Sequence, residues 1–191
     1  GMGGVGKTTL ALEVAYACAG QPRAAACEFT WPHFNYIIWT SADGTTLTLN
    51  DLLDTIAVHL GFSGLTQKTI AEKRNRVNDI LAQQPILLIV DNFETINDNA
   101  IADFCAKVPS KTRVLLTSRE TEKLLPPIFL RFPPARIRLG GLPDEEALTF
   151  LRLEAERLAN LRRGSERARL EGVLAADDQT LLPLVKATEG N

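Results

Sequence analysis

The chain has 191 residues, of which 45% are hydrophobic and 23% charged, and its formal net charge is −2 at pH 7. This length is enough to bury a core in one domain, or in one domain and part of another. The small net charge gives no electrostatic reason to expect nucleic-acid binding, and the apolar runs are too short for a membrane span of about 20 residues. The three cysteines, Cys18, Cys27 and Cys105, are scattered without a C-x-x-C motif. This usage is typical of reduced cytosolic proteins, so we expect a cytoplasmic location.

The first nine residues, GMGGVGKTT, match the phosphate-binding pattern G-x-x-x-x-G-K-[ST]. Glycines let successive backbone N–H groups approach a polyphosphate without a Cβ in the way. The following helix, through residues 10–15, aims its positive end at the same anion, which argues against a chance glycine-rich turn. Lys7 is placed to reach the β- and γ-phosphates, and the Thr8 hydroxyl to ligate Mg²⁺. The expected nucleotide-binding residues are therefore Gly1, Gly3, Gly4, Val5, Gly6, Lys7, Thr8 and Thr9.

A phosphate-binding loop normally follows a β-strand, yet the sequence begins at Gly1. We therefore expect a fragment of a longer protein whose first strand lies outside this sequence.

Strand patterns alternate with helical patterns along the next part of the chain, which predicts an α/β fold with a parallel sheet. The continuous apolar run before Asp91 fits a strand that is buried on both faces. A helix that Asn50 or Asp51 caps is expected to end at Gly61, and Ile70 is expected to face inward from the helix after it. The predicted strands cover residues 35–40, 86–91, 113–117 and 135–139, and the predicted helices cover residues 52–60, 67–83 and 96–107.

Beyond Gly140-Gly141 the pattern becomes entirely helical. Asp144 is expected to cap a helix that runs through Leu158, and two more helices are expected at about 165–175 and 177–189. We therefore place a domain boundary near residue 141, between residues 1–141 and residues 142–191. The arginines of this segment alternate with glutamates, which favours a solvated helix face over a nucleic-acid site.

Polar residues follow two of the predicted strands, where ligands of open α/β sheets bind. Asp91 ends a buried strand downstream of the phosphate loop and is positioned to hold Mg²⁺ through its water shell. The alternative for Asp91 is a helix cap or turn. Arg119 closes the Thr-Ser-Arg sequence after the next strand and can contact a γ-phosphate or sense its loss. Its alternative is a surface ion pair with Glu120 or Glu122. The candidate catalytic residues are thus Lys7, Asp91 and Arg119, and the candidate metal ligands are Thr8 and Asp91.

These motifs, in this order, resemble the NB-ARC (AP-ATPase) branch of the STAND signalling NTPases, and the bacterial members most closely. The phosphate loop alone is generic to many NTPases, but the ordered set is specific and spans nearly the whole chain. The closing residues 188–191 look like the start of the family's Gly-x-Pro motif. The residues that carry the resemblance are Gly1–Thr9, Leu87–Asn92, Leu115–Arg119, Leu139–Leu142, Glu145–Ala147 and Phe150-Leu151.

The resemblance implies a three-layer α/β/α P-loop NTPase sheet that lacks its first strand, followed by a partial all-helical lid at residues 142–191. It also implies the strand order second, Walker-B, sensor, phosphate-loop and last. The missing strand would then lie between residues 113–117 and 136–139. We therefore expect an open slot between these two segments, or poor pairing of the last strand.

The resemblance further implies a switch that binds ATP and ADP with Mg²⁺, hydrolyses ATP slowly and controls self-association of the full-length protein. Linked effector and sensor-repeat domains would lie outside this sequence. From the small net charge and the short apolar runs, we expect this domain to bind neither nucleic acid nor membrane. ADP would hold the lid closed, with a pivot at Gly140-Gly141.

Asn92 departs from the pattern, because many members carry a second acid at this position. Asn92 cannot act as a base at neutral pH, and Glu94 is nearby but out of register. This difference favours slow hydrolysis and leaves two alternatives open. One is a catalytically inactive nucleotide-binding scaffold, and the other is a P-loop enzyme such as a kinase or a transport ATPase.

Overall fold

The computed structural model describes residues 5–21, 30–42, 46–119, 129 and 133–187. Its contacts divide the chain into a first compact unit, Lys7–Ile137, and a second unit that contains the helices after Arg138. Several predicted features lie outside the described residues, namely Gly1, Gly3, Gly4, Cys27 and the closing motif at residues 188–191.

The first unit is an α/β fold built on a parallel sheet of three strands, β1 (Tyr36–Ser41), β2 (Ile86–Asp91) and β3 (Thr112–Leu116). Their order is β1-β2-β3, which confirms the expected sequence of second, Walker-B and sensor strands. All six residues of β2 are buried, as the continuous apolar run predicts for a central parallel strand. Because the strands are parallel, their carboxyl ends lie at one edge of the sheet.

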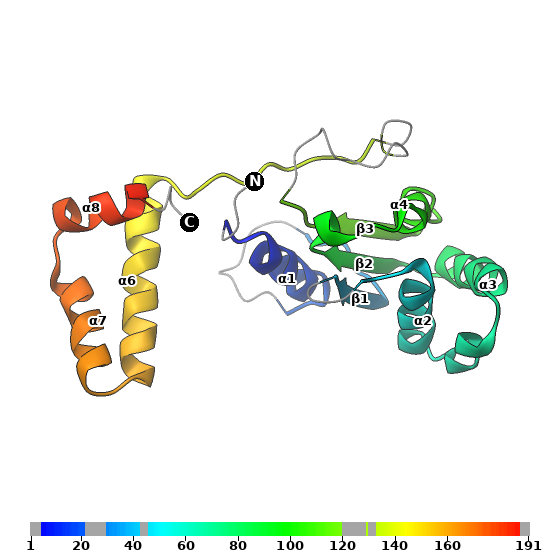
Figure 1. Cartoon of the computed structure of the whole chain (residues 1–191), viewed down its shortest axis with the longest axis horizontal. Helices are drawn as coiled ribbons and strands as arrows, with labels where there is room; N and C mark the ends of the chain where they lie inside the picture. The colour runs from blue at the N-terminus through cyan, green and yellow to red at the C-terminus, as the bar shows by residue number, and fades with distance from the viewer. Residues whose placement is uncertain (1–4, 22–29, 43–45, 120–128, 130–132, 188–191) are drawn as a thin grey trace. The chain divides into compact units, whose positions relative to one another are not determined.

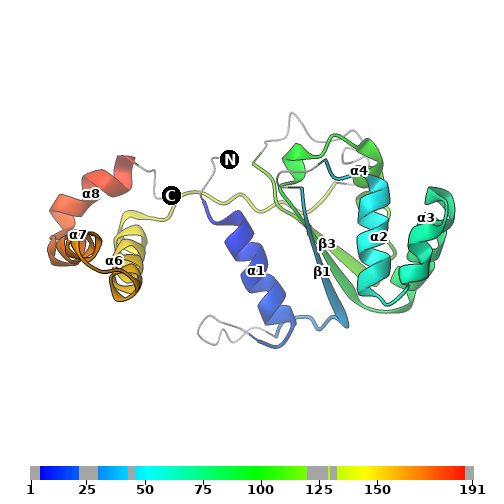
Figure 2. The same cartoon turned by 60° about the horizontal axis from the view of Figure 1, so that its bottom comes forward.

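Helices cover both faces of this sheet (Figure 1, Figure 2). Helix α1 (Lys7–Cys18) packs on one face against Leu87 and Ile89 of β2. The opposite face of β2 is formed by alternate side chains and packs into the larger core. That core takes in residues of α2 (Leu49–His59), α3 (Ile70–Gln83) and α4 (Asn99–Ala106). The first unit is therefore a three-layer α/β/α arrangement.

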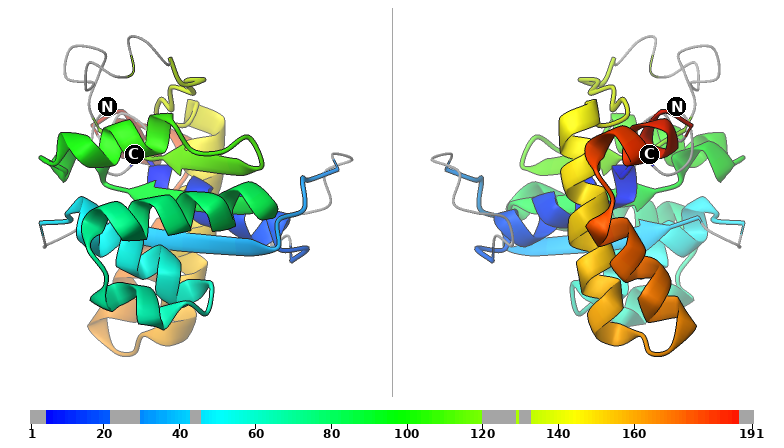
Figure 3. Two further views of the ribbon diagram at one scale, coloured as in Figure 1. Left: turned by 90° about the vertical axis from the view of Figure 1, so that its right-hand side faces the viewer. Right: turned by 90° about the vertical axis from the view of Figure 1, so that its left-hand side faces the viewer.

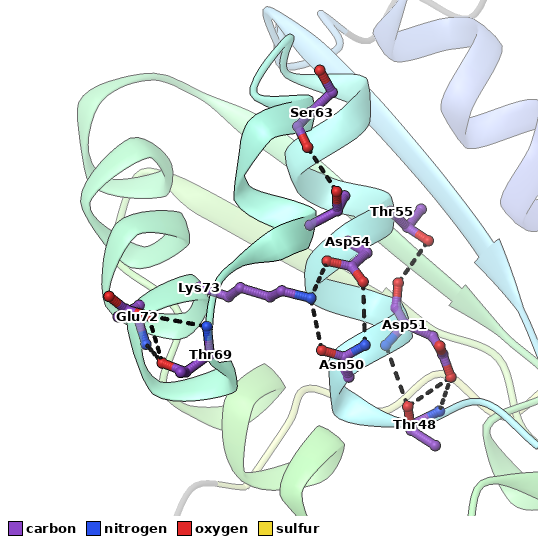
Figure 4. A network of polar contacts seen from close by, with 10 residues as sticks. Thr48, Asn50, Asp51, Asp54, Thr55, Ser63, Thr69, Glu72 and Lys73 are labelled. Carbon is purple, nitrogen blue, oxygen red and sulfur yellow. Dashed lines mark hydrogen bonds and ion pairs between the residues drawn. The ribbon is translucent and has the colours of Figure 1, made fainter.

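The structure corrects two details of how the helices on the larger core begin. Thr48, rather than Asn50 or Asp51, is the N-cap of α2. Its side chain accepts from the Asp51 backbone N–H, and the Asp51 carboxylate accepts from the Thr48 backbone N–H (Figure 4). This is a reciprocal capping box, in which a threonine at the N-cap pairs with an acidic residue three positions later. The sequence pattern therefore predicts a helix start that is two or three residues too late. Ile70 is the first residue of α3 and is 50% exposed, so the expectation that it faces inward was wrong.

A buried lysine joins α2 to α3 (Figure 4). The Lys73 side chain is 3% exposed, and its Nζ lies 2.6 Å from Asp54 Oδ1. The same Nζ donates to Asn50 Oδ1 at 2.8 Å, and Asn50 Nδ2 donates to Asp54 Oδ2 at 3.2 Å. A buried ammonium group is tolerated only when it is paired and hydrogen-bonded, and these contacts meet that requirement.

The second unit is a helical assembly of α6 (Asp144–Leu161), α7 (Ser165–Ala175) and α8 (Asp178–Ala187) (Figure 3). Leu148 of α6 packs with Leu181 and Val185 of α8 in a small core. Pro143 precedes the helix, so Asp144 is its first residue and not its cap. The negative charge of Asp144 still stabilises the start of α6, because it interacts favourably with the positive end of the helix dipole. Arg157, Arg162 and Arg167 pair with nearby glutamates on exposed helix faces, as Arg167 Nε does with Glu171 Oε1 at 2.7 Å.

The predicted strand at residues 135–139 is wrong. Residues 133–143 contain neither strand nor helix, and Ile137 is 84% exposed. A weakly alternating segment becomes a strand only when a neighbour supplies ladder hydrogen bonds. Within the described residues the sheet contains β1, β2 and β3 alone, so this segment does not pair with β3. This agrees with the expectation that the last segment is poorly paired.

Cys18 and Cys105 are free and buried. Burial raises the pKa of both thiols, that of Cys105 to about 12, because the thiolate is poorly solvated there. None of the described helices is long and apolar enough to cross a membrane.

Replacing Lys73 by Ala is expected to lower the free energy of unfolding by about 3 kcal/mol, because it leaves the carboxylate of Asp54 without its cation between α2 and α3. Urea unfolding can be followed by the fluorescence of Trp31 and Trp39, which are partly buried against the core between α1 and β2. Arg76→Ala, at an exposed position of α3, is the matched control and should change stability by less than about 0.5 kcal/mol. Equal effects of the two variants would contradict the structural role of Lys73.

Candidate functional site

Asp91, the last residue of β2, is 4% exposed and has an oxygen-rich environment. The Thr8 hydroxyl, in the first turn of α1, donates to its carboxylate and lies 2.9 Å from Oδ1 and 3.2 Å from Oδ2. The two predicted metal ligands, which are 83 residues apart in the chain, are therefore brought into direct contact. This contact requires α1 to begin at the same edge of the sheet where β2 ends.

Thr117 is a second hydroxyl partner of this carboxylate. Its Oγ1 donates to Asp91 Oδ1 at 2.5 Å and accepts from the Asn92 backbone N–H at 3.1 Å. Backbone hydrogen bonds hold it on both sides, from Thr117 N to Val90 O at 3.1 Å and from Phe93 N to Thr117 O at 2.9 Å. Thr117 is 7% exposed. The sequence analysis placed Thr117 at the end of the predicted strand 113–117 but gave it no role of its own. The structure ends β3 at Leu116, and a threonine at the end of a buried strand was the available signal.

The described part of the phosphate loop has the expected local geometry. Gly6 has a φ of +81°, in the left-handed region that favours glycine. Lys7 is the first residue of α1 and is partly buried, and Thr8 and Thr9 follow it in the first helical turn. The backbone N–H groups of a first helical turn have no intrahelical acceptor, so they are available to an anion.

The donor set of this site fits Mg²⁺. Thr8 and Asp91 offer only oxygen atoms, which Mg²⁺ prefers. The residues that the structure describes contain no group of three or more His, Cys, Asp or Glu side chains that could hold a metal ion. Magnesium is commonly held by one or two protein oxygens together with waters and substrate phosphates. The site therefore suits a cation that is bound together with a phosphate ligand.

Two further polar groups follow the strands. Asn92 adopts a left-handed conformation with φ of 57° and ψ of 44°, and its Nδ2 lies 3.5 Å from Ser41 Oγ at the end of β1. Arg119 Nε lies 3.3 Å from Glu94 Oε1. Glu120 and Glu122, the partners considered for Arg119 from the sequence, lie outside the described residues. Glu94, which the sequence analysis considered only as a substitute for the missing second acid, is thus a partner of Arg119 within the described residues.

Comparison with known proteins agrees with this geometry. A family model described as the NB-ARC domain matches residues 1–155. The chain belongs to the NB-ARC domain family. It is a nucleotide-binding module of the P-loop type within the STAND group of signalling NTPases.

One curated relative of this NB-ARC domain is the transcription activator GutR of Bacillus subtilis (strain 168), which is 37% identical over 198 residues. The match covers 100% of this chain but only 23% of GutR, so the chain spans less than a quarter of that relative. No solved structure matches the chain.

Replacing Thr117 by Val is expected to weaken Mg²⁺-dependent nucleotide binding about tenfold, because Asp91 loses the hydroxyl that orients it. The dissociation constant of ADP should be measured with Mg²⁺ and with EDTA, and the loss should appear only with Mg²⁺. Thr112→Val is the matched control, since Thr112 is also buried but lies at the opposite end of β3 and donates to Leu81 O. The orienting role of Thr117 is excluded if both variants bind Mg²⁺-ADP equally well.

Proposed function

We propose that this chain is the ATP/ADP-binding switch module of a larger signalling protein, with slow Mg²⁺-dependent ATP hydrolysis that controls self-association. The observation that carries the proposal is the joining of Thr8, Asp91 and Thr117 by direct hydrogen bonds at the carboxyl edge of the sheet. The hydroxyl and carboxylate that a P-loop NTPase uses toward Mg²⁺ lie together there, beside the helix start that receives the phosphates.

Each candidate residue has a distinct part in this proposal. The backbone of residues 1–6 and the N-terminus of α1 bind the phosphates, and Lys7 contributes a point charge to the β- and γ-phosphates. Thr8 and Asp91 would hold Mg²⁺, which neutralises charge on the phosphoryl oxygens when it is bound. Thr117 keeps the Asp91 carboxylate in place, and Arg119 contacts the γ-phosphate.

Slow turnover follows from the residue after Asp91. An efficient hydrolase positions a group that orients or deprotonates the attacking water. Asn92 can hydrogen-bond but cannot accept a proton at neutral pH. A slow ATPase suits a switch, because the ATP-bound state then lasts long enough for the other domains of the protein to respond to it.

We further propose that the output is control of transcription, delivered by parts of the protein outside this chain. The support is the 37% identity to GutR, whose name describes a transcription activator. In this proposal the nucleotide state sets self-association through the NTPase domain, and residues 142–191 act as a helical lid with its pivot at Gly140-Gly141. The sequence motifs for nucleotide binding thus serve regulation and not metabolism.

The ATPase of the full-length protein is expected to turn over more slowly than about once per second, below the usual range of enzymes. Lys7→Ala and Asp91→Ala should abolish hydrolysis, because they remove the phosphate-binding charge and the metal ligand. Phosphate release measured under ATP saturation, together with ADP binding, tests this. Turnover in the tens per second would reject the slow switch, and a wild-type protein that binds no nucleotide would reject the proposal entirely.

Asn92→Asp is expected to raise ATP turnover at least about tenfold, because it supplies the missing carboxylate. Aspartate tolerates the left-handed backbone at this position, so the fold should be kept. Asn75→Asp, at an exposed position of α3, controls for the added charge and should leave turnover unchanged. If both Asn92→Asp and the wild type bind ATP without hydrolysing it, the inactive scaffold is the correct description.

A further inference from the structure

Glu94 reaches the end of β3 through a specific turn. The chain reverses at Asn92 in the left-handed conformation and continues into a 3₁₀ turn at Phe93–Thr95. Phe93 is 5% exposed and anchors the turn in the core, with its ring 5.9 Å from that of Phe129. The Thr95 hydroxyl fixes the other end of the turn, within 2.8 Å of Asn92 O and 3.1 Å of Ala42 O. Glu94 is therefore held on a rigid segment, between two anchored neighbours.

The ion pair between Glu94 and Arg119 is asymmetric in burial. The Glu94 side chain is 11% exposed, whereas the Arg119 side chain is 61% exposed. One carboxylate oxygen, Oε1, faces Arg119 Nε at 3.3 Å. The other, Oε2, is buried and has no hydrogen-bond partner among the described residues. The carboxylate is thus the fixed member of the pair, and the arginine is the member that extends toward solvent.

This arrangement is unfavourable for stability alone. A buried carboxylate oxygen without a donor costs free energy, and an exposed ion pair returns little of that cost. Buried polar groups that lack a partner call for another explanation, and they are frequent at functional sites. The location of the pair suggests such an explanation, because Arg119 lies two residues after Thr117, which contacts Asp91 directly.

We propose that Glu94 is the positioning residue of Arg119 and that it directs the guanidinium to the γ-phosphate of bound ATP. The inference rests on the proposed function and deepens it. Glu94 engages the guanidinium through Nε, which is at the end nearest the backbone. An arginine held at Nε by a fixed carboxylate loses less side-chain freedom when its terminal nitrogens bind a phosphate. Glu94 thereby gives Arg119 its discrimination between ATP and ADP.

The test compares the dissociation constants of Mg²⁺-ADP and of a Mg²⁺-bound non-hydrolysable ATP analogue, measured by calorimetry on the full-length protein. Glu94→Gln keeps the shape of the side chain but removes its charge. It should lower the preference for the ATP analogue over ADP about fivefold, with ADP affinity unchanged. Arg119→Ala should produce the same loss, and the double variant should lose no more than either single variant. Glu94→Asp should restore part of the preference.

Asp103→Asn is the matched control, because it removes a carboxylate that pairs with Arg74 and Lys107 on another surface of the same unit. It should leave the preference unchanged. A purely structural role for Glu94 would weaken binding of both nucleotides alike, and this would overturn the inference. An unchanged preference in Glu94→Gln would also overturn it, and so would an increased preference, which would mean that Glu94 competes with the γ-phosphate. If the wild type binds neither nucleotide, the proposed function fails and the inference falls with it.

Discussion

The carboxylate of Asp91 is held by two hydroxyl groups from different chain segments, Thr8 in the first turn of α1 and Thr117 directly after β3. A carboxylate that is only 4% exposed requires donors of this kind, because burial removes its hydration. The two contacts tie three chain segments into one edge of the sheet. Charge-assisted hydrogen bonds are short and directional, so they also fix the carboxylate beside Thr8.

This contact depends on the layered packing around β2. Leu87 and Ile89 face α1, while Leu88 faces the core of α2, α3 and α4. A central strand buried on both faces cannot shift its register without exposing apolar side chains or burying polar ones. The end of β2 is therefore a fixed point, and Asp91 is placed on it. The helix that carries Lys7 and Thr8 is positioned by the same packing.

The groups proposed to act on the nucleotide lie beyond the strands, in turns whose conformations the neighbouring contacts determine. Asn92 turns the chain so that Phe93 enters the core and Glu94 approaches Arg119. In the proposed function, the end of the rigid strand β2 supplies the carboxylate for Mg²⁺, and the turns supply the groups that contact the γ-phosphate. A nucleotide switch requires both kinds of group. Its phosphate site must persist in the ATP-bound and ADP-bound states, while the group that contacts the γ-phosphate responds to ATP alone.

The sequence by itself predicted the phosphate loop, the three strands, and Thr8 and Asp91 as a pair of candidate metal ligands, because these features are encoded locally in glycine spacing and apolar runs. The order of the strands came from the family resemblance. The sequence could not determine the strand at residues 135–139, since strand formation depends on a neighbour. It also misjudged the start of α2, where Thr48 and Asp51 cap each other. Only the tertiary structure decided that Thr117 orients Asp91 and that Glu94 meets Arg119. Those contacts join residues that are 25 or more positions apart, and no local periodicity records which turns bring them together.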